Sequence, residues 1–148
     1  VKDWQPAEAQ KLMEQALTAN KNKIDAVLAP NDGTACGCIQ ALAAQGLAGK
    51  VPITGQDAEL AAAIRIVEGT QTMTIFKDTR LLGAKAIELA IKLAKKESIA
   101  DQINGKVNNN KIDVPSVLLT PYVVDKSNLD KMLIESGYLK REQVYKTK

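Results

Sequence analysis

Histidine is absent from this sequence of 148 residues. Its absence excludes the commonest general base of enzymes, the Ser-His and Cys-His nucleophile pairs, and most zinc-binding patterns. Aromatic residues make up only 3% of the chain, and its 20 basic and 17 acidic residues are scattered. The dense basic stripe with stacking aromatics that is typical of nucleic-acid binding is therefore lacking. We predict a protein that has no catalytic residues and does not bind nucleic acid.

Cysteine is scarce as well, since only Cys36 and Cys38 are present. On a helix, side chains at this spacing diverge by about 200°, so these two thiols cannot form a disulfide with each other. Neither a histidine nor a second cysteine pair accompanies them, so we predict no metal site. Segment 31–37 has neither the lysine of a Walker loop nor GxGxxG spacing, which argues against a nucleotide cofactor. No apolar run approaches the roughly 18 residues that span a bilayer.

In other respects the chain has an ordinary globular composition, with 45% hydrophobic and 25% charged residues. Helical periodicity predicts helices over 7–19, 34–45, 58–67, 79–96 and 128–136. Apolar or alternating runs predict strands over 24–29, 51–54, 71–76 and 114–119, and polar stretches predict a loop over 98–113 and a tail from Tyr138. Strands that alternate with helices of this length predict an α/β fold, with a parallel sheet and helices on both faces.

A polar or aromatic residue follows each of the first predicted strands. In open parallel sheets, ligands bind beyond the carboxyl ends of the strands, where the connecting loops converge. Trp4 lies where a preceding strand would end, and the residues that follow the next three predicted strands include Asn31, Asp57 and Lys77. This set suits a sugar, because amide, carboxylate and ammonium groups bond hydroxyls and an indole face covers the apolar side of a pyranose ring.

Each of these residues also has a plainer interpretation. Asp32 and Asp57 fit helix N-caps, and Asn31 fits a turn. Lys77 fits a solvated loop charge, and Trp4 a half-buried core residue. For Asp32 the cap interpretation is favoured, because its neighbour Asn31 already points toward the crevice.

Several segments together resemble the type I periplasmic sugar-binding proteins, and the likeness covers nearly the whole chain. The segments are VKDW at 1–4, APNDGTA at 29–35, GQDAEL at 55–60, GTQTMT at 69–74 and VPSVLLTP at 114–121. The second and third recur across these proteins, whereas the last two in combination are specific to the xylose branch.

The resemblance implies a two-lobe fold in which a hinge of three chain crossings joins two α/β lobes around one sugar. It further implies that this chain corresponds to the C-terminal part of that fold. Residues 1–77 would form the C-terminal lobe without its first βα units. Residues 78–113 would cross to an absent N-terminal lobe as a helix and loop, and 114–148 would return through the hinge to a C-terminal helix and tail.

By the same resemblance, Trp4 would stack on the sugar ring while Asn31, Asp57 and Lys77 would bond its hydroxyls. The implied function is a receptor that binds a monosaccharide, xylose first and glucose as the alternative. The implied partners are an ABC transporter permease or the extracellular domain of a sensor kinase. The implied location is periplasmic or extracellular, secreted or membrane-associated as a lipoprotein, with the signal region outside this chain.

Without a partner lobe, the predicted helix 79–96 would expose apolar residues, and a monomer rarely tolerates such a patch. We expect the N-terminal half or another chain to accompany this one. Two other classes of function stay open. The effector-binding domain of a sugar-responsive transcription regulator shares the fold, and an enzyme on a flavodoxin-like sheet is the weakest alternative.

Overall fold

The structure is a computed structural model, and it describes residues 1–145. The chain folds into two compact units. One unit combines Val1–Phe76 with the chain from Tyr122 onward, and the other is Lys77–Pro121. The lobe assignment implied by the resemblance, with breaks after residues 77 and 113, stays a prediction. No helix among the described residues has both the length and the hydropathy needed to cross a membrane.

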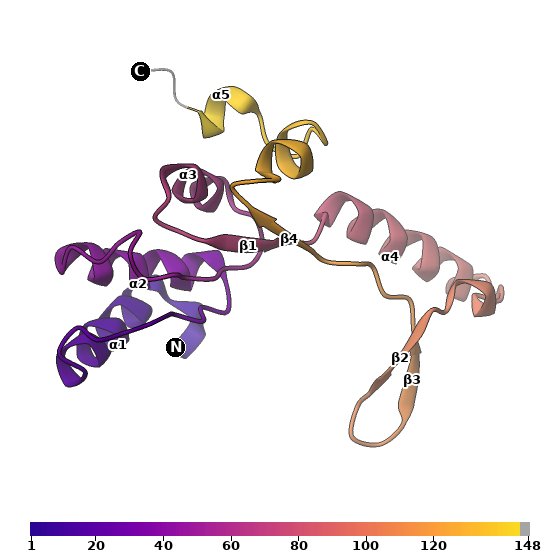
Figure 1. The fold of residues 1–148 in the computed structure, drawn as a ribbon. Helices are drawn as coiled ribbons and strands as arrows, with labels where there is room; N and C mark the ends of the chain where they lie inside the picture. The colour runs from indigo at the N-terminus through magenta and orange to yellow at the C-terminus, as the bar shows by residue number, and fades with distance from the viewer. Residues whose placement is uncertain (146–148) are drawn as a thin grey trace. The chain divides into compact units, whose positions relative to one another are not determined.

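The first unit begins with a short 3-10 turn, η1 (Lys2–Trp4), followed by helices α1 (Pro6–Ala19) and α2 (Asp32–Ala44). These two helices lie side by side (Figure 1). Their approach is close because Gly37 has no side chain, and a Cβ at this position would overlap the backbone carbonyl oxygen of Pro6. Buried apolar side chains fill the rest of the interface, among them Met13, Leu17, Ala41 and Leu42.

Three extended segments follow the hydrogen-bonding pattern of parallel strands. Val27 forms a parallel bridge with Ile53, through bonds from Val27 N to Pro52 O (2.9 Å) and from Thr54 N to Val27 O (3.1 Å). The chain from Gly55 to Asp57 pairs in the same sense with strand β1 (Met73–Phe76), through bonds from Ile75 N to Gly55 O (3.2 Å) and from Asp57 N to Ile75 O (2.9 Å). The parallel arrangement of the predicted strands is confirmed for these segments.

The first two of these strands are nevertheless less regular than predicted. The hydroxyl of Thr54 accepts a hydrogen bond from Ala29 N (3.0 Å) and donates to Ala29 O (3.1 Å). The hydroxyl of Thr72 likewise accepts from Ile53 N (3.0 Å). Because side chains satisfy backbone groups that a regular ladder would pair, the two segments meet in a single bridge. Regular pairing occurs instead between β1 and an antiparallel strand, β4 (Tyr122–Asp125), which the sequence did not predict.

A second core lies around helix α3 (Leu60–Glu68), which ends at Gly69 in the left-handed conformation (φ 82°). Its members come from distant parts of the chain and include Ile66, Phe76, Val124, Leu133 and Val144. The predicted helix 128–136 is a turn followed by one π-helical turn, η3 (Asp130–Ile134). The predicted tail from Tyr138 is wrong as far as residue 145, because it holds a short helix, α5 (Arg141–Val144). Residues 146–148 of that tail lie outside the described residues.

One carboxylate holds α5 against η3. Asp130 accepts a hydrogen bond from the Tyr145 hydroxyl (2.6 Å) and one from the Arg141 guanidinium (2.8 Å). The two donors, Tyr145 first, lower the pKa of Asp130 below its ordinary value of 3.8. These bonds therefore contribute to stability above pH 3.8, and their contribution is lost as the pH falls through the lowered pKa.

We expect Tyr145→Phe to loosen α5 by removing its bond to Asp130. Hydrogen exchange at the amides of 143–145 should become faster, while exchange in α2 stays unchanged. Tyr122→Phe is the control, because Tyr122 is exposed and lies outside this cluster. Equal exchange rates at 143–145 in both variants and the parent chain would show that the cluster does not hold the helix.

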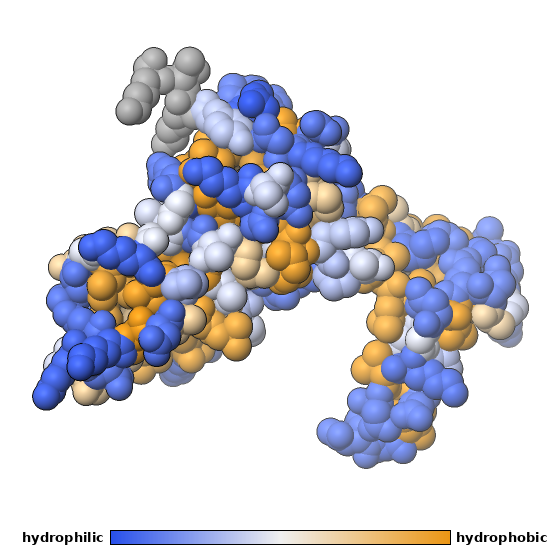
Figure 2. All heavy atoms as spheres, viewed as in Figure 1, coloured by the Kyte–Doolittle hydropathy of each residue, from blue (hydrophilic) through white to orange (hydrophobic). Residues whose placement is uncertain are grey.

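The second unit contains helix α4 (Thr79–Ala94), a 3-10 turn η2 (Ala100–Gln102) and an antiparallel hairpin, β2 (Gly105–Asn108) with β3 (Asp113–Ser116). The predicted loop 98–113 is thus wrong in its second half. No residue of α4 is buried, and apolar atoms are exposed on this unit (Figure 2). The exposed apolar side chains of α4 are Leu81, Leu82, Ile87, Ile91 and Leu93.

Candidate functional site

Asn31 is the N-cap of α2. Its Oδ1 accepts hydrogen bonds from Thr34 N (2.9 Å) and the Thr34 hydroxyl (2.6 Å). The Thr34 hydroxyl in turn accepts a bond from Asn31 N (3.4 Å), which closes a capping box. The cap uses the oxygen of the amide, and no group within residues 1–145 accepts a bond from Nδ2. The half-buried Asn31 therefore fixes the helix through its amide oxygen, and the cap does not use its amide N–H groups.

Asp32 is not a helix cap, so the cap interpretation favoured for it is wrong. Its carboxylate is fully buried and accepts hydrogen bonds from Glu59 N (3.0 Å), Gln71 Nε2 (2.8 Å) and the Thr74 hydroxyl (3.0 Å). Burial raises the pKa of Asp32, and the donors, with the charge of Arg65, act in the opposite direction. The carboxylate joins the start of α2 to the chain before α3 and to β1.

Arg65 completes this buried network from α3. Its Nη2 donates to the backbone oxygen of Asp32 (3.0 Å), and its Nε donates to Gln71 Oε1 (2.9 Å). Gln71 therefore accepts from Arg65 and donates to Asp32. No buried side-chain nitrogen or oxygen in the described part of the chain lacks a partner, which is typical of a rigid native polar network.

Asp57 is exposed, in a tight turn next to this network. Both Asp57 (φ 99°) and Ala58 (φ 53°) have left-handed backbone angles, which cost residues other than glycine roughly 1–3 kcal/mol each. The turn is fixed by the bonds from Asp32 N to Gln56 O (2.9 Å) and from Asp57 N to Ile75 O (2.9 Å). The first bond joins the residue after Asn31 to the residue before Asp57, so these two predicted site residues belong to neighbouring loops.

Glu59 adds a carboxylate next to this turn. Its pKa is raised, first by desolvation and then by the charges of Asp32 and Asp57, while Arg65 acts in the opposite direction. The turn therefore presents acidic groups, and the charge of the Arg65 guanidinium partly offsets theirs. Such acceptors suit hydroxyl groups, which donate hydrogen bonds without bringing a like charge.

Trp4 is 60% exposed, so the core interpretation of this residue is wrong. Its backbone has a φ of 58°, which is unusual for a bulky side chain. Pro6 follows two residues later and packs on the first turn of α2, where a Cβ at Gly33 would lie 3.8 Å from Pro6 Cγ. The N-terminal segment thus passes the end of α2 that Asn31 caps, two residues after the exposed Trp4.

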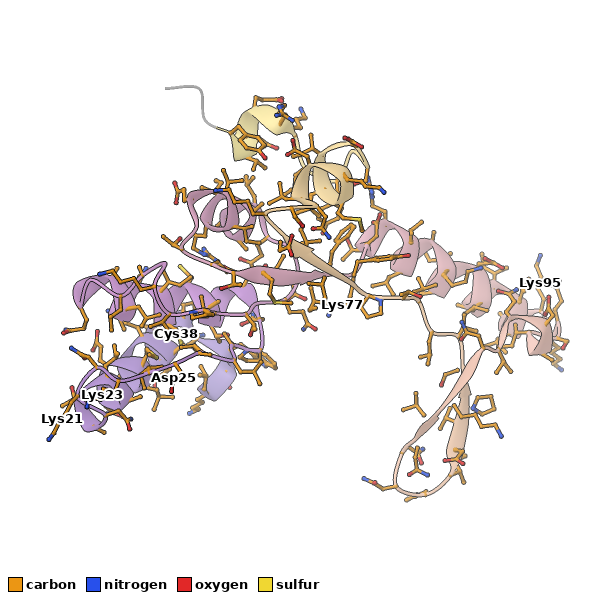
Figure 3. The ribbon with its side chains drawn as sticks, viewed as in Figure 1. Lys21, Lys23, Asp25, Cys38, Lys77 and Lys95 are labelled. Carbon is orange, nitrogen blue, oxygen red and sulfur yellow. The ribbon has the colours of Figure 1, made fainter. Side chains whose placement is uncertain are left out.

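Lys77 lies between β1 and the start of α4 (Figure 3). It is half-buried and is the first residue of the second unit. The structure thus brings together the loops of Asn31 and Asp57 and places Lys77 directly after β1. Its role toward a ligand, like that of the other three residues, stays a prediction.

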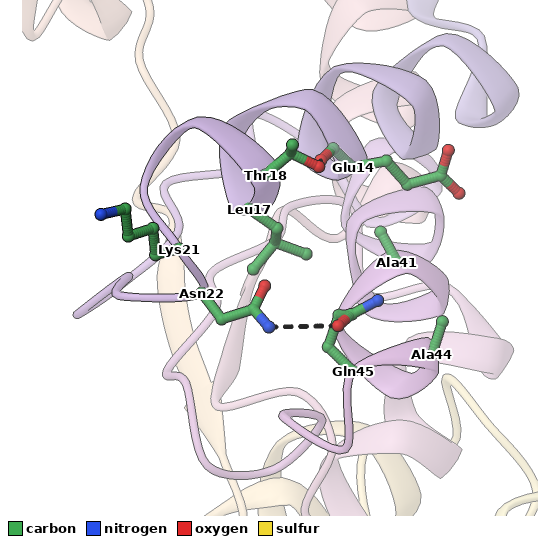
Figure 4. A pocket seen from close by; sticks show the side chains of 8 residues that line it. All are labelled: Glu14, Leu17, Thr18, Lys21, Asn22, Ala41, Ala44 and Gln45. Carbon is green, nitrogen blue, oxygen red and sulfur yellow. Dashed lines mark hydrogen bonds between the residues drawn. The ribbon is translucent and has the colours of Figure 1, made fainter.

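A separate pocket of ≈ 540 Å³ lies between the C-terminal halves of α1 and α2 (Figure 4). Asn22 Nδ2 donates to Gln45 Oε1 across it (3.1 Å). None of the predicted site residues lines this pocket. Cys36 and Cys38 are free, half-buried thiols, and the described residues contain no cluster of three or more potential metal ligands.

Sequence reasoning missed Gln71, Thr74 and Arg65 as parts of the site's framework. Gln71 and Thr74 lie in an alternating segment, where polar positions are expected to face solvent. They are instead 2% and 0% exposed. Only the acidic residue at position 32, directly after a predicted ligand residue, hinted that polar partners were needed.

Comparison with known proteins identifies the family. Residues 1–98 match the model of a periplasmic binding protein domain. The chain is 51% identical over 145 residues to the D-xylose-binding periplasmic protein of Haemophilus influenzae. This match covers 98% of this chain and 43% of the relative. Its identity to the D-xylose-binding periplasmic protein of Escherichia coli is 52% over 145 residues, covering 97% of this chain and 43% of the relative.

Solved structures give the same result for the fold. A carbohydrate transporter solute-binding protein from Chloroflexus aurantiacus, in complex with D-glucose, superposes with a TM-score of 0.81 at 38% identity. The match covers 91% of this chain and 40% of that one. The chain thus spans less than half the length of the relatives it matches. The family resemblance and the type I α/β fold predicted from the sequence are confirmed, and the chain belongs to the periplasmic binding proteins.

Proposed function

We propose that this chain forms part of a receptor for a monosaccharide, with D-xylose as the first candidate and D-glucose as the second. The observation that carries the proposal is the pair of neighbouring loops in which Asn31 keeps an amide donor and Asp57 presents a carboxylate. A donor beside an acceptor suits the vicinal hydroxyls of a sugar. The names of two relatives, which share more than half of their matched residues with this chain, support xylose.

In this proposal Trp4 stacks on the apolar face of the ring, and Lys77 donates to a further hydroxyl. The receptor is periplasmic or extracellular, secreted or anchored as a lipoprotein, and it presents its sugar to an ABC transporter permease or to a sensor kinase. The exposed apolar face of α4 packs against the N-terminal lobe of the complete receptor or another chain. No chemical step is required, since a binding protein acts by closing around its ligand.

A chimera tests the sugar assignment. The segment of the Escherichia coli relative that matches this chain is replaced by this chain, and D-xylose binding is measured by calorimetry. We expect saturable binding, and we expect Asp57→Ala to weaken it roughly 10- to 100-fold, because a hydrogen bond to a charged group contributes about 1.5–3 kcal/mol.

Glu68→Ala is the matched control, since it removes an exposed carboxylate at the end of α3 in the same unit. Its affinity for D-xylose should equal that of the unmodified chimera. D-glucose and D-ribose are titrated in parallel. A folded chimera that binds none of the three sugars, while the Escherichia coli relative binds D-xylose, would refute the proposal.

A further inference from the structure

Two buried residues hold the loop that carries Asp57 through hydrogen bonds, and no sugar can reach them. Asp32 and Thr74 are both 0% exposed. Asp32 follows the ligand candidate Asn31 directly, and its Oδ2 accepts from both Glu59 N (3.0 Å) and the Thr74 hydroxyl (3.0 Å). A single carboxylate oxygen therefore joins the first ligand loop to the segment that follows Asp57.

Thr74 connects this carboxylate to the turn itself. Its hydroxyl donates to Asp32 and accepts from Ala58 N (3.2 Å), so the proton of the hydroxyl points toward the carboxylate and its lone pair toward the turn. Ala58 is buried, so its N–H would have no water to bond if the hydroxyl were removed. The bond from Thr74 is thus a specific restraint on the residue next to Asp57.

The turn needs restraint, because two successive residues, Asp57 and Ala58, have left-handed backbone angles. Such angles persist only where the surrounding structure holds them. Three backbone groups of the turn and its border, Gln56 O, Ala58 N and Glu59 N, are bonded to Asp32 or Thr74. Without these bonds, the turn would relax to ordinary angles and the carboxylate of Asp57 would change direction.

We propose that Asp32 and Thr74 are positioning residues for the sugar site, which fix the turn 56–58 and so hold Asp57 in the loop next to that of Asn31. The inference rests on the proposed function. It adds that the affinity for the sugar depends on a buried hydrogen-bond relay as well as on the side chains that touch the ligand. Outer groups of this kind change affinity about 10- to 100-fold in metal sites.

The test uses two substitutions at position 74 in the chimera with the Escherichia coli relative. Thr74→Val keeps the shape and removes the hydroxyl, so it should weaken D-xylose binding about tenfold. Thr74→Ser restores the hydroxyl without the methyl group and should return the affinity to within about twofold of the unmodified chimera. A role in packing alone predicts the reverse order, because serine is the variant that loses volume.

Leu42→Ala is the control for stability. Leu42 is fully buried between α1 and α2, away from the turn, so this variant should melt at a lower temperature and bind D-xylose with unchanged affinity. Hydrogen exchange provides a readout without sugar. The amides of 56–59 should exchange faster in Thr74→Val and Asp32→Asn than in Leu42→Ala and Thr74→Ser.

The two proposals fail in different ways. If the unmodified chimera binds no sugar but Thr74→Val accelerates exchange at 56–59, the sugar assignment is refuted and the restraint on the turn is supported. If the chimera binds D-xylose and Thr74→Val binds it equally well, the sugar assignment stands and the positioning role is overturned. Equal exchange at 56–59 in all variants would also overturn the positioning role.

Discussion

Gly37→Ala is expected to lower the free energy of unfolding by roughly 3 kcal/mol. The new Cβ would overlap the carbonyl oxygen of Pro6 and would also lie 2.9 Å from Gln10 N. Both atoms belong to the backbone of α1, so no side-chain rotation can relieve the overlap. The helices would have to separate and loosen the apolar interface that includes Leu17 and Leu42. Alanine gains about 1 kcal/mol of helix propensity over glycine, which is too little to offset this loss.

Gly33→Ala is the matched control, because it makes the same chemical change one turn earlier in α2. Its Cβ would lie 3.6 Å from Asn31 Nδ2 and 3.8 Å from Pro6 Cγ, which are ordinary contact distances. We expect this variant to be as stable as the parent chain or slightly more stable. Urea unfolding followed by circular dichroism measures both. A loss below about 1 kcal/mol for Gly37→Ala would mean that the helices separate easily.

Gly55→Ala is expected to destabilise the chain by roughly 3–5 kcal/mol. A Cβ at this position would overlap both Asp32 Oδ1 and Gln71 Nε2, the two atoms that form the 2.8 Å bond at the centre of the buried network. Either the bond breaks and leaves buried polar atoms unpaired, or the strands move apart. Both outcomes lower the stability of the fold, because Asp32 and Gln71 are buried and cannot bond water instead.

A double substitution tests this explanation. Gln71→Ala alone removes the amide and should be destabilising, but it also makes space for a methyl group at Gly55. The double variant Gly55→Ala with Gln71→Ala should therefore lose less stability than the sum of the two single variants, by about 1 kcal/mol or more. Urea unfolding of the four proteins gives the coupling directly. Additive losses would place the cause of the Gly55→Ala effect outside the network.

Helices α1, α2 and α3 were predictable because each has a local signal. Pro6 opens α1 and Gly69 ends α3, and apolar residues recur at helical spacing between them. The elements that sequence reasoning missed depend on contacts between distant residues. Helix α5 is short, and Asp130 holds it through Tyr145, fifteen positions away. No pattern within the segment itself could reveal that contact.

The first strand of the hairpin in the second unit, β2, was missed for a different reason, whereas β3 overlaps the predicted strand 114–119. The asparagines of the hairpin are typical of an irregular loop, yet here they build the turn. Asn109 Oδ1 accepts hydrogen bonds from the backbone of Lys111 and Ile112 (3.0 Å each), and Asn108 Nδ2 donates to Asp113 Oδ1 (2.7 Å) across the strands. Polar composition shows where a chain turns, but it does not show whether the flanking segments pair.

For the candidate site, strand-end reasoning selected residues that lie in neighbouring loops, Asn31 and Asp57. It assigned the wrong role to Asp32, because a carboxylate at the start of a helix fits a cap and a buried acceptor equally well in sequence. The two cases differ in what lies opposite the side chain. For Asp32 these partners are Gln71 and Thr74, about forty positions later.

The threonines that replace ladder bonds limit how this protein can change over evolutionary time. Valine and threonine have almost the same shape and similar strand preference, so strands often exchange them. At Thr54 and Thr72 that exchange would remove the hydroxyl that bonds the backbone of Ala29 or Ile53. A drift toward more hydrophobic strands, harmless in a sheet with a complete ladder, would here remove the side-chain bonds that supplement the few backbone bonds between neighbouring strands.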